Sequence, residues 1–258
     1  MGKNKLARWT ELSTFSNVLQ PEISGTPGKD HFIKGNWRDE IFRNSNPVVL
    51  ELGCGKGEYT IALSRILPSR NFIGVDIKGA RLWRGAKTSN ENRISNAAFL
   101  RTRIEFIGSF FAADEIDEIW LTFPDPHPNR RNSNKRLVCP WFLNAYRAFL
   151  KDKGVIHLKT DNTELFDYTV KLAKAAGLEI LFSTNDLHAY QEADKNTLVS
   201  FYSKLYGTGG NVAELEKILS IKTHYETIFI KGGLKIKYLA FRLEKEQFIH
   251  DAGERACR

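Results

Sequence analysis

The sequence predicts an α/β fold in which a mostly parallel, seven-stranded sheet is covered by helices on both faces. Strand-like apolar runs alternate with segments of helical periodicity through the first five predicted strands, and this alternation is typical of parallel sheets. The chain has 258 residues, of which 42% are hydrophobic, so it can form one large domain with a substantial core. Ligands of such sheets bind beyond the carboxyl ends of the strands, where we expect the functional residues.

Each predicted strand is a short apolar run that ends at a glycine, a proline or a polar turn residue. These runs lie at residues 48–53, 71–76, 97–102, 118–123, 155–160, 178–183 and 234–243. The predicted helices have helical spacing of apolar residues, most with a cap or stop signal. They are expected at 58–67, at 79–92, from Pro140 to Leu150, between a cap at Asp161 or Asn162 and a stop at Gly177, and around 211–220.

Composition divides the chain into an N-terminal arm and a main domain. Residues 1–46 contain prolines, glycines and scattered basic residues without a long periodic pattern, so we expect an arm that is partly disordered or wraps the domain. The main domain is expected to span 47–258, with an irregular insertion near 184–233. Parts of the arm are expected to dock through its aromatic residues, which are Trp9, Phe15, Phe32 and Trp37.

Charge and cysteine content restrict the class of protein. Lysine and arginine total 38 against 30 acidic residues, a net charge of +8, and this excess favours a polyanionic partner such as nucleic acid. The three cysteines are Cys54, Cys139 and Cys257, and their wide spacing predicts neither a disulfide framework nor a metal site. The N-terminus lacks the apolar core of a signal peptide, and no apolar run approaches the roughly 20 residues of a membrane span. A soluble, cytoplasmic protein that does not bind membranes is therefore expected.

The first predicted strand ends in a glycine turn that follows a carboxylate. Glu51 precedes Gly53 and Gly55, and these glycines let a ligand lie against bare backbone. The dinucleotide fingerprint needs a further glycine where Glu58 stands, so it is not met. Asp76 ends the second strand, where an acidic side chain can accept both hydroxyls of a ribose. A carboxylate at Glu51 suits an ammonium or sulfonium group, so the pattern favours S-adenosyl-L-methionine over NAD, and a tight turn without a ligand is the alternative.

The fourth predicted strand leads into a second candidate site. Asp125 lies between two prolines, which fix the backbone and hold the carboxylate stiffly, as catalysis by positioning requires. A rigid structural turn is the alternative. Asp161 after the fifth strand brings another carboxylate to the same edge, unless it caps the next helix. The basic residues after Asp125 are expected to bind phosphates, although a solvated loop is the simpler explanation; they are Arg130, Arg131, Lys135 and Arg136.

Six runs of the sequence occur together in a known enzyme family. They are ELGCGKGEYT, FIGVDIKGAR, LTFPDPHPNRR, KRL, GVIHLKTDN and Thr-x-Tyr-Glu. With them the chain resembles the bacterial tRNA (guanine-N7)-methyltransferases over about residues 47–243, and the combination of FPDP with KTDN is far more specific than the glycine turn. The resemblance implies a Rossmann-like class I S-adenosylmethionine-dependent methyltransferase fold, and methylation of a guanosine in the tRNA variable loop.

The resemblance also implies roles for individual residues. Glu51 and Asp76 match cofactor-binding positions. Asp125 matches the catalytic residue, which also contacts the cofactor, and Asp161 matches a tRNA-binding position. A late segment matches the substrate motif of the family, although its residues alone indicate only a loop or a helix surface; it consists of Thr223, His224, Tyr225 and Glu226.

Three positions depart from the family pattern. His127 stands where the family has Trp, which weakens a stacking role there. Asn129, a candidate substrate-binding residue, stands where the family has Lys, so Arg130 or Arg131 would supply that charge. Arg103, a candidate cofactor-binding residue, stands where the family has an acidic or amide residue. Because a guanidinium cannot accept a hydrogen bond from adenine, a backbone group would have to bind the adenine there.

Two other functions are compatible with the same fold. A small-molecule methyltransferase would have a closed pocket and would not need the basic excess. A non-catalytic RNA-binding protein is expected to lack Glu51, Asp76 or Asp125, and all three are present. For the expected enzyme, tRNA is the partner, no obligatory protein partner is evident, and the chain is expected to be a monomer or a homodimer.

Overall fold

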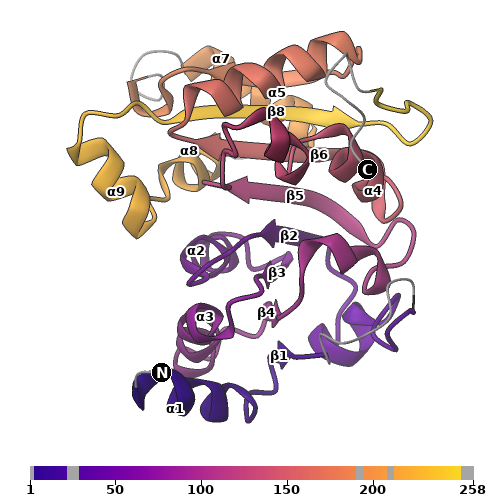
Figure 1. The fold of residues 1–258 in the computed structure, drawn as a ribbon, viewed down its shortest axis with the longest axis vertical. Helices are drawn as coiled ribbons and strands as arrows, with labels where there is room; N and C mark the ends of the chain where they lie inside the picture. The colour runs from indigo at the N-terminus through magenta and orange to yellow at the C-terminus, as the bar shows by residue number, and fades with distance from the viewer. Residues whose placement is uncertain (1–2, 22–28, 190–194, 208–211, 251–258) are drawn as a thin grey trace. The chain divides into compact units, whose positions relative to one another are not determined.

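The computed structural model describes residues 3–21, 29–189, 195–207 and 212–250. The chain forms two compact units, Met1–Ile119 and Trp120–Arg258. Strands and helices occur together in each unit (Figure 1), which confirms the predicted α/β class.

In the first unit the strands lie in the order β1-β4-β3-β2, followed by the first half of β5. The pairs β1–β4, β4–β3 and β3–β2 are all parallel. Every residue of β2, β3 and β4 is buried, as expected for parallel strands that are covered on both faces. The strands are β1 (Val18–Leu19), β2 (Val48–Leu52), β3 (Asn71–Val75), β4 (Ala97–Leu100) and β5 (Ile116–Thr122).

Helices α2 and α3 follow β2 and β3, as the sequence predicts. Ile61 of α2, Leu82 of α3 and Phe99 of β4 belong to one buried cluster, so both helices lay their apolar faces on the sheet. The helical segments of this unit are α1 (Lys3–Leu12), the π-helix η1 (Trp37–Phe42), α2 (Glu58–Ile66), α3 (Gly79–Glu91) and the 3-10 helix η2 (Ile104–Ser109).

The described part of the N-terminal arm contains three elements that its sequence pattern does not predict, namely α1, β1 and the π-helix η1. Helix α1 packs along α3 (Figure 1), and β1 pairs with β4. Both are short or poor in apolar residues, so contacts with the rest of the unit stabilise them rather than local periodicity. The docking of aromatic residues is confirmed for Phe15 and for the fully buried Trp37, whereas Phe32 is 67% exposed.

In the second unit the second half of β5 is followed by β6, β8 and β7. Strand β8 is antiparallel to both of its neighbours. The strands are β6 (Leu150–Thr160), β7 (Ile180–Thr184) and β8 (Lys237–Leu243). The helical segments are η3 (Arg130–Lys135), α4 (Pro140–Tyr146), α5 (Thr163–Ala175), α7 (Lys195–Tyr206), α8 (Val212–Ser220) and α9 (His224–Lys231).

Three details differ from the sequence prediction, and one choice that it left open, the cap of α5, is decided. The described residues contain eight strands rather than seven, and the extra strand is the two-residue β1. The helix from Pro140 ends at Tyr146, because Leu150 already begins the long strand β6. The insertion contains α7 and α9 in addition to the predicted α8. Asn162, and not Asp161, caps α5, since its side-chain oxygen accepts the backbone N–H of Leu165.

No helix in the described part of the chain is both long enough and apolar enough to cross a membrane.

Candidate functional site

The carboxyl end of β2 leads into a loop that three glycines shape. Gly53, Gly55 and Gly57 have φ angles of 78°, 55° and 68°, which residues with side chains rarely adopt. The backbone N–H groups of Gly53 and Cys54 both donate to the carbonyl of Val75, at 2.8 and 3.0 Å. The loop therefore turns sharply and closes onto the end of β3.

The glycines of this loop serve two different purposes. A Cβ atom on Gly57 would lie 2.6 Å from Cε1 of the buried Phe99 ring, so this position has no room for a side chain. A Cβ atom on Gly53 or Gly55 would meet no atom within 4 Å. These two positions leave bare backbone beside open space, as the approach of a cofactor requires.

Asp76 and Glu51 hold the loop and the helix behind it. Oδ2 of Asp76 accepts the N–H of Gly55 at 2.9 Å, and Oδ1 accepts that of Lys78 at 2.7 Å. The Glu51 side chain accepts both the backbone N–H, at 2.8 Å, and the hydroxyl of Thr60 in the first turn of α2. The sequence predicts a Glu51 that faces a ligand, but the residue is only 3% exposed, because the unpaired N–H groups at a helix start attract a carboxylate.

Two carboxylates place negative charge near the thiol of Cys54 in this loop. Burial raises the pKa of the Cys54 thiol well above its ordinary value, and the nearby Glu51 and Asp76 charges raise it further. The thiol therefore stays protonated and is unsuited to act as a nucleophile. The same negative charges suit a cationic ligand, so the residues at this loop fit the sulfonium and ammonium groups of S-adenosyl-L-methionine.

Arg103 lies three residues after the end of β4, just before η2. Its backbone is extended, and its exposed side chain lies 3.9 Å from the Glu105 carboxylate. Its guanidinium is thus directed toward a neighbouring surface acid, and the expected adenine contact through a backbone group stays a prediction.

Asp125 lies exposed in the loop after β5. Phe123 and His127, on either side, have φ angles of 51° and 42°, which are strained for residues with side chains. Arg136 donates from Nε to the carbonyl of Pro126 at 3.1 Å and to that of His127 at 3.3 Å. The loop is therefore held firmly while its carboxylate stays at the surface.

The position of Arg136 differs from the predicted phosphate contact. Its side chain is buried, and its guanidinium lies over the ring of Tyr168 at 4.6 Å. Because its N–H groups are directed at loop carbonyls, it positions the Asp125 loop instead. Arg131, Lys135 and Asn129 are exposed around η3. The side chain of Arg130 lies outside the described part of the structure.

The Thr-x-Tyr-Glu segment forms the start of α9. The Thr223 hydroxyl accepts the backbone N–H of Glu226 at 3.2 Å and so caps the helix. His224 and Tyr225 are exposed. Glu226 is fully buried, so the prediction that this segment is only loop or helix surface is wrong for this residue.

Glu226 forms a cluster with the fully buried Lys159 and the partly exposed His188. Its Oε1 atom lies 2.9 Å from both Lys159 Nζ and His188 Nε2. Lys159 also donates to the carbonyl of Ile221 at 2.7 Å. Burial lowers the pKa of Lys159, and the Glu226 carboxylate opposes that shift. Sequence reasoning did not single out Lys159 or His188, because residues so far apart in the chain leave no local pattern.

The Asp161 side chain is half-buried, and its backbone carbonyl accepts Nζ of Lys237 at 3.1 Å. Because Asn162 caps α5, the Asp161 carboxylate is not needed for that purpose.

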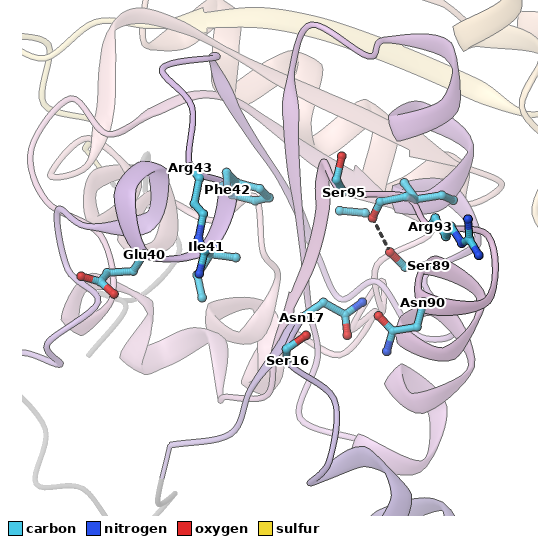
Figure 2. A pocket seen from close by; sticks show the side chains of 12 residues that line it. Ser16, Asn17, Glu40, Ile41, Phe42, Arg43, Ser89, Asn90, Arg93 and Ser95 are labelled. Atoms are coloured by element: carbon cyan, nitrogen blue, oxygen red, sulfur yellow. Dashed lines mark hydrogen bonds between the residues drawn. The ribbon is translucent and has the colours of Figure 1, made fainter.

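A cavity of about 590 Å³ in the first unit contains none of the predicted site residues. Figure 2 shows polar and basic side chains around it, among them Asn17, Arg43, Asn90 and Arg93. Ala97, at the amino end of β4, also lines it. In a parallel sheet this is the end opposite to the glycine loop, so the cavity is separate from the candidate cofactor site.

The chain matches a family model described as "Putative methyltransferase" over residues 45–215. It is 43% identical to a tRNA (guanine-N(7)-)-methyltransferase of Bacteroides thetaiotaomicron, over 97% of this chain and 90% of that protein. It is 44% identical to the protein of the same name from Porphyromonas gingivalis, over 88% of this chain and 81% of that protein.

Two solved structures have a similar fold. The 16S rRNA methyltransferase KamB has a TM-score of 0.56 at 11% identity, over 85% of this chain and 98% of that one. An antibiotic-related methyltransferase has a TM-score of 0.51 at 16% identity, over 84% and 96%. These similarities confirm the predicted class I methyltransferase fold.

Proposed function

Because the chain belongs to the tRNA (guanine-N7)-methyltransferase family, we propose that it transfers a methyl group from S-adenosyl-L-methionine to N7 of a guanosine in the tRNA variable loop. The observation that carries the proposal is the similarity to a relative of that name over 97% of the chain. The geometry adds two sets of residues, one in each unit, whose chemistry fits this reaction.

The first unit supplies the residues for cofactor binding. Gly53 and Gly55 offer bare backbone, and Glu51 and Asp76 provide negative charge. Arg103 would contribute its backbone to adenine recognition. When bound, S-adenosyl-L-methionine supplies a methyl group on a positively charged sulfur, and the carboxylates of Glu51 and Asp76 favour that charge.

The chemistry places modest demands on the second unit. N7 of guanine has a lone pair and no proton, so no general base is needed to generate the nucleophile. The protein has to position the base and to stabilise the positive charge that the base acquires. Asp125 suits both tasks, since its carboxylate can accept the N–H groups of the Watson–Crick edge of guanine and is exposed to reach them. Arg136 acts as a positioning residue through the Asp125 loop.

The remaining candidates would bind the tRNA around this base. Arg130, Arg131 and Lys135 supply positive charge for phosphates, with Asn129 at the start of the same segment. A second group would supply polar and aromatic contacts; it consists of Asp161, His224 and Tyr225. Thr223 caps α9 and, with the buried Glu226, fixes the start of this helix.

The location, domain organisation and oligomeric state of the protein are also proposed. We propose a cytoplasmic enzyme in which residues 1–46 form an arm on the catalytic domain 47–258. No obligatory protein partner is expected. Sedimentation equilibrium would distinguish a monomer of 29.4 kDa from a homodimer.

The proposal is tested with unmodified tRNA transcripts and methyl-labelled S-adenosyl-L-methionine. We expect labelled 7-methylguanosine at one position of the variable loop. The matched control is a ligated tRNA with 7-deazaguanosine at that position, which lacks the acceptor nitrogen and should take up no label. Label at another atom or nucleotide would contradict the proposal. Label only in small molecules would favour the small-molecule alternative, and a failure to bind the cofactor in calorimetry would favour a non-catalytic RNA-binding protein.

A further inference from the structure

Helices α1 and α3 carry a basic surface that the proposed reaction does not use. We define the α1–α3 basic face as the described basic side chains of these two helices together with two neighbours beside them. Within the segments 5–12 and 78–91 the only acidic residues are Glu11 and Glu91. The basic residues of the face are Lys5, Arg8, Lys78, Arg81, Arg84, Lys87 and Arg101.

Glu11 fixes α1 on α3 and leaves the face with a net positive charge. Its Oε2 atom accepts the indole N–H of Trp83 at 2.8 Å, and its Oε1 atom accepts Nζ of Lys87 at 2.8 Å. The next residue, Leu12, is fully buried in the core of the first unit. Because Glu11 already pairs with Lys87, its charge does not offset the other basic residues.

Two tryptophan rings hold cationic groups in place on this face. The Arg8 guanidinium lies 4.8 Å from the ring centre of Trp83. The Arg101 guanidinium lies 5.1 Å from that of Trp9, and Lys5 Nζ lies 5.3 Å from the same ring. Such cation–π contacts restrict flexible side chains before binding, so less entropy is lost when a ligand orders them.

The face begins beside the candidate cofactor loop. Asp76 directly follows β3 and accepts the N–H of Lys78. Helix α3 starts at the next residue, Gly79. Arg81 and Arg84 follow at a spacing of three residues and are exposed. Positive charge thus continues from the carboxyl end of the sheet along the surface of α3.

We propose that the α1–α3 basic face binds the phosphate backbone of the tRNA substrate, an inference that rests on the proposed function. Arginine predominates on the face, and its planar fork of N–H groups matches phosphate oxygens. Backbone contacts of this kind position an RNA without reading its sequence. The face therefore contributes to affinity for tRNA, whereas the Asp125 loop of the second unit acts on the base.

The test compares two variants that each remove two exposed charges from a helix surface. R81Q/R84Q lies in the basic face. K171Q/K174Q is the matched control on α5, with the same spacing and exposed side chains. Dissociation constants for full-length tRNA are measured by filter binding over a range of NaCl concentrations. The KM for tRNA and kcat are measured by methyl transfer.

We expect R81Q/R84Q to weaken tRNA binding about tenfold and to reduce the log–log salt slope by roughly 1.4–1.8, since each lost phosphate contact contributes about 0.7–0.9. Its KM for tRNA should rise while kcat stays unchanged, and K171Q/K174Q should behave as the wild type. An unchanged KM and salt slope for R81Q/R84Q, in an enzyme whose wild type methylates tRNA, overturns the inference alone. A wild type that methylates no tRNA instead overturns the proposed function.

A parallel sedimentation assay with phosphatidylglycerol vesicles tests whether the α1–α3 basic face binds anionic lipid instead of tRNA. The proposal expects tRNA binding to depend on Arg81 and Arg84. If these substitutions abolish vesicle binding and leave tRNA binding intact, the face binds anionic lipid and the proposal is wrong.

Discussion

Two buried carboxylates, one in each unit, are held in different ways. In the first unit, Glu51 is held by the N–H and hydroxyl of Thr60, which carry no charge. In the second unit, Glu226 is held by the Lys159 ammonium and by His188. Uncharged donors leave the negative charge of a carboxylate in place, whereas a cationic partner neutralises it. From this comparison we propose that Glu51 supports binding of a cationic ligand, whereas the Glu226 cluster mainly stabilises the fold.

Asp125 shows a third arrangement, in which a carboxylate is exposed rather than buried. Asp125 is exposed on a loop whose backbone is strained at Phe123 and His127. Strain of this kind persists only where the surrounding structure holds it, and Arg136 provides such support through the carbonyls of Pro126 and His127. An exposed carboxylate of this kind contributes little to stability and is available to a substrate.

The largest expected effect is on activity, through Asp125. Asp125→Asn should reduce kcat for tRNA methylation by at least about 100-fold, the scale seen when a single charge-stabilising group is removed, and should leave the urea midpoint unchanged. The exposed Asp167 of α5 offers a matched control, and Asp167→Asn should retain full activity. Normal turnover by the Asp125 variant would contradict the proposal that the exposed carboxylate serves the reaction.

The next effect is on stability, through the buried cluster. Lys159→Met should lower the free energy of unfolding by about 3–5 kcal/mol, because removal of one partner leaves a buried charge without its counter-ion. The double variant K159M/E226L, measured in the same urea titrations, should be more stable than K159M. If K159M changes only the KM for tRNA and not stability, Glu226 serves the substrate rather than the fold.

A smaller effect should separate the two kinds of glycine in the loop after β2. Gly57→Ala should destabilise the protein by about 3 kcal/mol, since the new methyl group meets the Phe99 ring and the backbone is left-handed. Gly55→Ala carries only the backbone strain of about 1–2 kcal/mol, but it should weaken binding of S-adenosyl-L-methionine in calorimetry. Equal affinity of Gly55→Ala and wild type for the cofactor would argue against a ligand on this backbone.

The smallest effect concerns Glu11, a carboxylate that has both an uncharged and a cationic donor as partners. Its hydrogen bonds to Lys87 and, secondarily, to Trp83 lower its pKa from the ordinary value of 4.5. Because the folded pKa is the lower one, the stabilisation is complete above 4.5 and is lost as the pH falls through the folded pKa. Hydrogen exchange of the α1 amides should show greater protection in wild type than in Glu11→Gln at neutral pH. The difference should shrink in acid, and a constant difference would contradict this origin.

The sequence by itself determined the order of strands and helices in the main domain and the family. Buried parallel strands appear as continuous apolar runs, and glycine or proline marks their ends, so β2, β3 and β5 and the positions of Asp76 and Asp125 could be located from local pattern. The motifs around Glu51 and Asp125 are equally local, which is why the cofactor and the reaction could be inferred from them.

Tertiary structure decided what each of these side chains contacts. The burial of Glu51 against α2, the loop-holding role of Arg136 and the cluster of Lys159, His188 and Glu226 depend on residues that are distant in the chain. The same holds for α1, whose few apolar residues predict no helix. Its contacts with α3 through Leu12 and Glu11 exist only in the folded unit. Hydrogen bonds and ion pairs between distant segments leave no periodic trace in a sequence, because their partners are brought together only when the chain folds.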